Sequence, residues 1–202
     1  MCGRYNFTVE QNDEIIEILE KLNAKLHHTA TVKTGDVYPT NQAPILVREQ
    51  EEISPTISAW GFPKFDEKGV IINARSETAS EKRTFRDSLH NRRCIIPSTG
   101  FYEWDSEKRK FLFRMEGRRV LYMAGLYTQY REELRFVILT TEANASMKEI
   151  HTRMPLVIPR EEVSSWIMED QATGDFLKRV PPQLVREVVK EENFGYQYKM
   201  DL

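Results

Sequence analysis

Prolines and polar residues divide the middle of the chain into short apolar runs, and this pattern constrains the fold more than any other feature. Pro39, Pro44, Pro55 and Pro63 interrupt the region that begins near Val37. Short apolar runs bounded by such residues are typical of β-strands, whereas a helix needs a longer periodic segment. The first strands predicted in this way are Ile45–Val47, Ile57–Trp60, Val70–Ile72 and Cys94–Ile96.

Further strands are predicted in the second half of the chain. Lys110–Met115 and Val120–Leu126 flank Glu116-Gly117, a pattern that predicts a β-hairpin. Phe136–Thr140 and Met154–Ile158 predict two more strands.

Helical segments are fewer than strands. Thr8 and Gln11 have the spacing of a capping box, and apolar residues then recur at helical intervals as far as Leu26. His27 and His28 follow in the last turn, where we expect cap and solvent-facing residues rather than ligands. The other predicted helical segments are a short helix capped by Asn144, Glu161–Ile167 and Leu184–Lys190.

These elements predict one compact unit. A chain of 202 residues is long enough for one sizeable core, and it contains neither an internal repeat nor a convincing linker. We therefore predict an α+β fold: a single domain over residues 1–202 with a mainly antiparallel, barrel-like β-sheet covered by a few helices.

Composition narrows the class of protein. Hydrophobic residues make up 40% and charged residues 30% of the chain, which is typical of a soluble globular protein. The apolar runs are too short to span a bilayer and no secretory signal is present, so we expect no membrane association and a cytoplasmic location. With only two cysteines, a disulfide scaffold is not expected. The cysteines and the four histidines lack zinc-site spacing, so we expect no metal and no cofactor. Nothing indicates a homo-oligomer, so a monomer is expected.

The first residues, Met1-Cys2-Gly3-Arg4, carry the most distinctive chemistry. If Met1 is removed, Cys2 presents an α-amine and a thiol on the same residue. Their ordinary pKa values are roughly 8 and 8.5, so both reach nucleophilic forms near neutrality with modest help. An aldehyde can form an imine with the amine and then close a thiazolidine ring with the thiol. By itself the dipeptide Met-Cys also fits an incidental small residue at a frayed terminus.

Three other fragments place polar residues next to predicted strands. Asn73 and Arg75 follow a buried strand two residues apart, so their side chains point to the same face. Glu103 lies among aromatic residues, where partial desolvation would suit a general acid or base; the alternative is a glutamate on an exposed strand face. His151 and Arg153 stand just before a strand, and such a histidine is as readily structural as catalytic.

Charge is unevenly distributed. The net charge of −2 argues mildly against a general nucleic-acid binder. Between Lys68 and Gly100, however, seven Lys or Arg residues stand against three acidic ones. This local excess suits a phosphate-binding surface, and it equally suits an ordinary solvated face.

Taken together, the fragments occur in a specific order along residues 1 to about 160. They are Met1-Cys2-Gly3-Arg4-Tyr5, Pro39 with Ala43-Pro44, Trp60-Gly61, Asn73-Ala74-Arg75-Ser76-Glu77-Thr78, Arg92-Arg93-Cys94-Ile95-Ile96-Pro97, Gly100-Phe101-Tyr102-Glu103-Trp104, Ala124-Gly125-Leu126 and His151-Thr152-Arg153-Met154-Pro155. In this combination the chain resembles the SOS response-associated peptidase (SRAP) family, which includes a sensor of abasic sites in single-stranded DNA.

The resemblance implies that the protein reacts with damaged DNA. Met1 would be removed by the protein's own peptidase activity, and Cys2 would then crosslink to the C1′ aldehyde of an abasic site by lyase-type, covalent protein–DNA chemistry. Asn73 would hold the backbone and amine of Cys2, Glu103 would shuttle protons, and His151 would help the sugar ring to open. The implied partner is single-stranded DNA that contains abasic sites, with the protein associated with the nucleoid while bound.

The resemblance also implies a DNA-contacting surface. Arginines would meet phosphates, and aromatic rings would stack on flanking bases. The residues so assigned are Arg4, Pro39, Trp60, Arg75, Arg86, Trp104 and Arg153. The chain departs from the family pattern after Trp60-Gly61, where Phe62-Pro63-Lys64-Phe65 replaces a longer tryptophan-containing loop, and at Arg83, where proline is common.

Two other functional classes stay open at this stage. One is a cysteine peptidase or amidohydrolase in which Cys2 is an N-terminal nucleophile and Glu103 or His151 is the base. The other is a non-covalent binding module for single-stranded DNA in which Cys2 plays no part.

Overall fold

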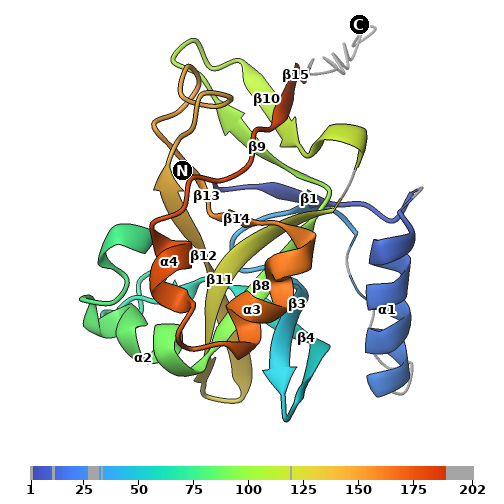
Figure 1. Cartoon of the computed structure of the whole chain (residues 1–202), viewed down its shortest axis with the longest axis vertical. Helices are drawn as coiled ribbons and strands as arrows, with labels where there is room; N and C mark the ends of the chain where they lie inside the picture. The colour runs from blue at the N-terminus through green and yellow to red at the C-terminus, as the bar shows by residue number, and fades with distance from the viewer. Residues whose placement is uncertain (1, 11, 27–31, 33, 119, 190–202) are drawn as a thin grey trace, which may run out of the picture.

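Five strands close into a small barrel. The computed structural model describes residues 2–10, 12–26, 32, 34–118 and 120–189. The barrel strands pair in the ring β12–β4–β3–β8–β11–β12, and every pairing is antiparallel except β4–β12 (Figure 1). Closure of this kind leaves no unpaired edge around the ring. The bounds are β3 (Gln42–Glu49), β4 (Glu52–Trp60), β8 (Arg93–Ser98), β11 (Leu121–Tyr130) and β12 (Glu133–Glu142).

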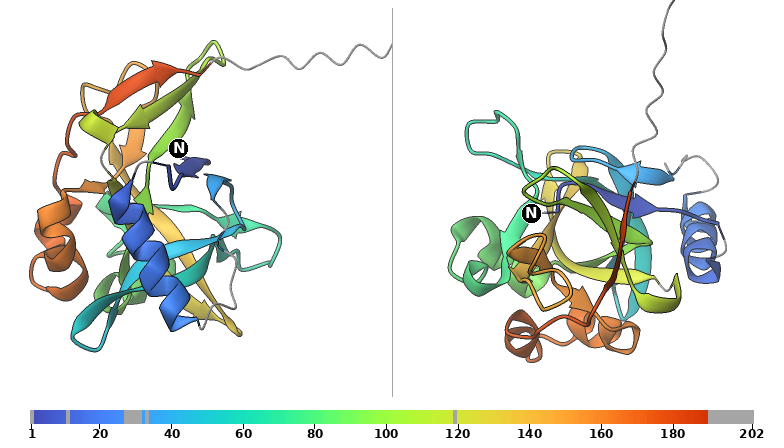
Figure 2. Two further views of the ribbon diagram at one scale, coloured as in Figure 1. Left: turned by 90° about the vertical axis from the view of Figure 1, so that its right-hand side faces the viewer. Right: turned by 90° about the horizontal axis from the view of Figure 1, so that it is seen from above.

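A second sheet of five antiparallel strands lies over one end of the barrel, in the order β15–β10–β9–β1–β2 (Figure 2). Its strands are β1 (Tyr5–Phe7), β2 (Gly35–Val37), β9 (Gly100–Trp104), β10 (Lys110–Arg114) and β15 (Val185–Val188). Short strands complete the edges: β5 (Phe62–Pro63) pairs with β6 (Val70–Ile71), β7 (Asn73–Arg75) and β13 (Arg153–Pro155) pair with β12, and β14 (Val157–Ile158) pairs with β11.

Helices cover the outside of the strands. In Figure 1 the first helix lies on one side of the molecule, and the second and fourth lie on the opposite side. The α-helices are α1 (Asp13–Lys25), α2 (Arg83–Asn91), α3 (Val163–Met168) and α4 (Thr173–Leu177). Three short 3₁₀ helices are η1 (Ser76–Thr78), η2 (Glu116–Arg118) and η3 (Arg160–Glu162).

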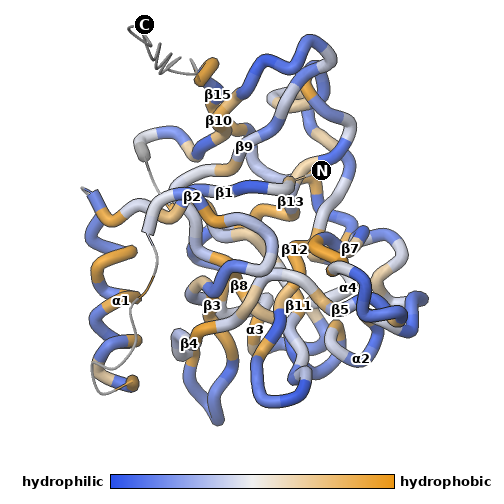
Figure 3. Tube along the Cα trace, turned by 180° about the vertical axis from the view of Figure 1, so that it is seen from behind, coloured by the Kyte–Doolittle hydropathy of each residue, from blue (hydrophilic) through white to orange (hydrophobic). Residues whose placement is uncertain are grey.

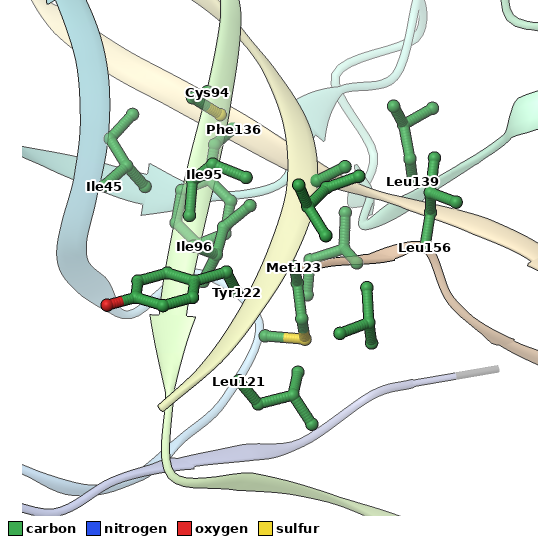
Figure 4. Close-up of a cluster of buried hydrophobic side chains, with 14 of the residues drawn as sticks. Ile45, Cys94, Ile95, Ile96, Leu121, Tyr122, Met123, Phe136, Leu139 and Leu156 are labelled. Atoms are coloured by element: carbon green, nitrogen blue, oxygen red, sulfur yellow. The ribbon is translucent and has the colours of Figure 1, made fainter. Parts of the chain in front are cut away.

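The core fills the barrel. All six residues of β8 are buried, as expected for a strand with partners on both edges and side chains packed on both faces. Figure 4 shows Ile45, Ile95, Ile96 and Phe136 among a cluster of buried hydrophobic side chains, and Figure 3 shows hydrophilic residues in the turns at the lower end.

The predicted fold class is confirmed: the molecule is mostly β, with a closed, mainly antiparallel barrel and few helices. The predicted hairpin is wrong, because β10 belongs to the second sheet and β11 to the barrel. The turn at Glu116-Gly117 was recognisable from the local sequence, but strand pairing depends on contacts between residues far apart in the sequence. The hairpin that does form joins β11 to β12.

Three predicted helix signals are also wrong. Asn144 is followed by a series of turns over residues 145–150 and not by a helix. The first helix begins at Asp13, and its N-cap is Asn12, whose Oδ1 accepts the N–H of Ile15 at 3.2 Å. The segment Leu184–Lys190 contains a strand, since β15 pairs with β10. Gln11, His27 and His28 lie outside the described residues, and the helix over Arg83–Asn91 was not predicted.

Gly125 in β11 generates a stability prediction. A Cβ at this position would lie 2.7 Å from the carbonyl oxygen of Val137 and would clash with the side chain of Ile96. Because the carbonyl belongs to a paired strand, G125A should lower the free energy of unfolding by about 1–3 kcal/mol.

The matched control is G174A in α4, where nothing lies within 4 Å of the added atom. That variant should be neutral or stabilised by up to about 1 kcal/mol. Urea unfolding of both variants measures the difference; equal stability of the two would contradict the close packing between β8, β11 and β12.

Candidate active site

Cys2 is held at the junction of the two sheets. It comes just before β1, and its side chain is only 1% exposed. The Nδ2 of Asn73 donates a hydrogen bond to the carbonyl oxygen of Cys2 at 2.9 Å. Asn73 reaches this point because β7 pairs with β12 through the register Asn73↔Ile138. Residues 71 positions apart in sequence are therefore joined at the start of the chain.

Glu103 faces the same buried place from β9. The strand β9 pairs with β1, with Tyr5 opposite Phe101, and the N–H of Tyr102 donates to the Arg4 carbonyl at 2.9 Å. Phe101 and Glu103 share one face of β9, and the Glu103 side chain is only 4% exposed. The alternative of an exposed glutamate is thus wrong, and the carboxylate lies close enough to act electrostatically on Cys2.

The thiol of Cys2 is kept in its neutral form. Burial raises the pKa of the Cys2 thiol well above its usual value, and the nearby Glu103 carboxylate raises this pKa further. The S–H donates weakly to the Arg4 carbonyl, with 3.7 Å between the two heavy atoms. Around neutral pH the resting site therefore holds a thiol and not a thiolate.

His151 lies at the end of the loop that joins β12 to β13. Figures 1 and 2 show this loop beside β9 and the start of the chain. The backbone N–H of Arg153 donates to Nδ1 of His151 at 2.9 Å. The carbonyl oxygen of Arg153 lies 3.1 Å from the same nitrogen, so Nδ1 faces both polar groups of the Arg153 backbone. These contacts fix the direction of the imidazole.

Arg4 lies in an aromatic slot beside Cys2. Its guanidinium carbon is 4.5 Å from the centre of the Tyr38 ring and 5.3 Å from that of Trp104. Asp36 is 3.8 Å from Arg4 and accepts a hydrogen bond from the Tyr102 hydroxyl at 2.9 Å. This group brings together two predicted DNA contacts, Arg4 and Trp104.

Sequence reasoning missed Tyr38, which is 39% exposed and directly precedes the predicted contact Pro39, itself half-buried. Its position directly before a proline, where the region of short strands begins, carried no sign of a stacking role.

The other predicted DNA contacts divide into two groups. Arg75 on β7 and Arg86 on α2 are exposed. Arg153 is largely buried and forms a bidentate ion pair with Glu77, at 2.6 and 2.8 Å. The first group is accessible to a polyanion, whereas Arg153 already has a carboxylate partner.

Trp60 requires a correction. Its side chain is fully buried, stacks on Phe136 with ring centres 6.2 Å apart, and donates its indole N–H to the Ile72 carbonyl at 2.9 Å. A ring in this position cannot stack on a base, so the assignment of Trp60 to DNA contact is wrong. In the loop that follows, Phe62 is buried and Phe65 is fully exposed.

This arrangement of fold and site is that of a known family. A family model described as SOS response associated peptidase (SRAP) matches residues 1–192. The chain belongs to this family. The family assignment predicted from the motifs is therefore confirmed.

Named relatives and solved structures agree with the SRAP assignment. Abasic site processing protein YoqW of Bacillus subtilis (strain 168) is 29% identical over 198 residues, covering 88% of this chain and 85% of the relative. Abasic site processing protein YedK of Escherichia coli (strain K12) is 27% identical over 179 residues, covering 84% and 81%. A crystal structure of a Bordetella bronchiseptica protein is 25% identical with a TM-score of 0.76, covering 94% of this chain and all of the other.

The described part of this SRAP chain contains no cluster of three or more His, Cys, Asp or Glu side chains arranged to hold a metal ion. Within the same residues, no helix combines the length and apolar character needed to cross a membrane.

The raised thiol pKa generates a reactivity prediction. Each unit by which a pKa rises above the ambient pH removes about 90% of the remaining thiolate. At pH 8, iodoacetamide should therefore label the native Cys2 at least about 10-fold more slowly than the same cysteine in urea. Peptide mass spectrometry follows each site, and buried Cys94, whose pKa is also raised by burial, serves as the internal reference. Fast labelling of native Cys2 would contradict the neutral-thiol site.

Proposed function

We propose that this SRAP protein captures abasic sites in single-stranded DNA through a thiazolidine formed by Cys2 after removal of Met1. The observation that carries the proposal is the grouping of buried Cys2 with Asn73 and Glu103, drawn from three separate segments. Relatives at 27–29% identity are named abasic site processing proteins. The product would shield a reactive sugar from further cleavage.

The α-amine of Cys2 is the first nucleophile in this scheme. The thiol is held neutral, so it attacks poorly until an electrophile stronger than an aldehyde is present. Oδ1 of Asn73 is buried and has no hydrogen-bond partner among the described residues, while Nδ2 of the same amide holds the Cys2 carbonyl. An amine on Cys2 would supply the N–H donor that this oxygen lacks. Asn73 would thus fix both ends of the nucleophilic residue.

The reaction balances with the loss of one water. The amine adds to C1′ of the open-chain sugar, and the resulting carbinolamine expels water to give an imine. The sulfur of Cys2 then bonds to the same carbon, and the imine nitrogen gains a proton as the thiol loses one. Glu103 is placed to move protons in these steps, because its buried carboxylate acts directly on the thiol.

Ring opening precedes capture. A closed abasic sugar carries a hydroxyl on C1′, and the ring oxygen must gain a proton as the aldehyde forms. His151, whose ring is held by the backbone of Arg153, is suited to donate a hydrogen bond to that oxygen. This role requires the imidazole to keep one orientation.

Exposed cations and rings would hold the strand. Arg75 and Arg86 are accessible to phosphates, and Arg4 with Trp104 and Tyr38 forms a cationic aromatic surface beside Cys2. Stacking of this kind is sequence-tolerant and contributes about 1–3 kcal/mol per base. A complementary strand would compete for the same base faces, so a single strand is the preferred partner.

Peptidase activity would be confined to maturation. A general cysteine peptidase needs a thiolate, and burial beside Glu103 opposes that form at Cys2. We propose that the Met1–Cys2 bond is the substrate and that its cleavage exposes the amine.

The deciding test uses DNA strands that differ only at one sugar. A single strand with an abasic site should give a band that resists denaturation, with Cys2 as the attached residue by mass spectrometry. Strands with a tetrahydrofuran analogue or a borohydride-reduced site should bind but form no adduct, because both lack the C1′ aldehyde. A variant with non-removable residues before Cys2 should also form none. An adduct with the tetrahydrofuran strand, or one that maps to Cys94 or a lysine, would contradict the thiazolidine.

Phosphate contact by Arg75 predicts a change in salt dependence. R75Q should weaken binding of the tetrahydrofuran strand regardless of its sequence and should lower the log–log salt slope by about one. The matched control is R48Q, which removes the same charge from the exposed turn end of β3. Fluorescence anisotropy at several salt concentrations measures both. Altered base preference with an unchanged slope would mean that Arg75 reads bases instead.

A further inference from the structure

Glu77 holds Arg153 in a fixed position next to the site. The two oxygens of Glu77 accept from the two terminal nitrogens of Arg153, at 2.6 and 2.8 Å. A third bond runs from Nη2 of Arg153 to the Thr140 carbonyl at 2.6 Å. A planar guanidinium bound on two sides in this way keeps one orientation. The ion pair joins η1, which follows β7, to the start of β13.

The charge state of Glu77 supports a persistent pair. The hydrogen bonds from Arg153 hold the pKa of the Glu77 carboxyl below its usual value. The carboxylate is therefore ionised throughout the neutral range, and the pair would be lost only when the pH falls through this lowered pKa. The Arg153 side chain is only 14% exposed, whereas that of Glu77 is 43% exposed. Water therefore competes with the ion pair mainly at Glu77.

The backbone of Arg153 in turn orients His151. Its N–H donates to Nδ1 at 2.9 Å, and its carbonyl oxygen is 3.1 Å from the same nitrogen. The imidazole thus lies against the peptide unit of a residue whose own side chain is clamped. Release of the Arg153 side chain would loosen this peptide unit at the start of β13, and with it the ring that lies against it.

We infer that Glu77 is a positioning residue for His151, acting through Arg153. This inference rests on the proposed role of His151 in opening the abasic sugar. It also gives Arg153 a role different from the phosphate contact expected for it, since its two terminal nitrogens are already bonded to Glu77 and Thr140. Glu77 itself touches no reacting atom in this scheme; it fixes the direction of the His151 ring.

The test separates orientation from binding. In E77Q, crosslinking at saturating abasic DNA should slow by about 10- to 100-fold, since small displacements of a reacting group have effects of that size. Affinity for the tetrahydrofuran strand should stay the same or rise, because a negative charge is lost and Arg153 is released. E77D keeps the charge and should recover part of the rate. The control E51Q removes the carboxylate that pairs with Arg48 in the turn between β3 and β4, at the far end in Figure 1, and should change neither quantity.

A double-mutant comparison shows whether the effect passes through His151. If it does, E77Q should slow wild-type crosslinking but add little in an H151A background. Full additivity, a wild-type rate in E77Q, or a loss explained entirely by weaker DNA binding would overturn the inference. Thermal unfolding shows whether each variant is folded. If E77Q is unfolded, the comparison is made with E77D instead.

Nitrogen NMR of the His151 ring provides a readout that does not depend on the reaction. The native protein should show one sharp set of ring nitrogen signals, and E77Q should show shifted or broadened signals because the ring is no longer held in one direction. Native protein that forms no adduct would refute the proposed function, whereas the ring signals would still decide whether Glu77 orients His151. Identical ring signals in the native protein and in E77Q would overturn the inference.

Discussion

The pairing of β12 on both edges is the constraint on which the rest of the structure depends. One edge carries β11 and then β13, and the other carries β4 and then β7. A strand bonded on both sides cannot shift its register without breaking several ladders at once. The same strand that closes the barrel therefore fixes where β7 begins, at Asn73, and where β13 begins, at Arg153. Residues of the candidate site are thus positioned by the strand that closes the barrel.

Burial then decides the chemistry that the site can support. Cys2 and Glu103 lie together in a region that excludes water, and a negative charge on the thiol would be opposed both by desolvation and by the carboxylate. In the scheme proposed above, the neutral thiol would therefore react late, after the amine has formed an imine. The hydrogen bond from Asn73 keeps the first residues of the chain in this place despite their terminal position. Without such a hydrogen bond, conformational entropy would favour many positions of the terminus over this buried one.

Much of the site was visible in the sequence because its residues stand beside apolar runs. Glu103 among aromatic residues and Asn73 directly after a buried strand are polar residues where packing alone would select apolar ones. Trp60 shows the limit of this reasoning. A tryptophan at the end of a short strand has the same local pattern whether its ring faces the core or a ligand, and only contacts with Tyr5 and Phe136 show which it is.

By itself, the sequence determined the class of fold and most strand positions and supplied the candidate reactive groups, since short-range periodicity, turn residues and side-chain chemistry are local properties. Tertiary structure alone decided which strands pair, that the strand after Glu116-Gly117 leaves its predicted partner for the barrel, and that Arg153 turns toward Glu77. It also decided that the thiol of Cys2 is neutral at rest. These outcomes depend on which distant strands pair with one another and on the exclusion of water from the core. Both are properties of the folded chain and not of any short segment.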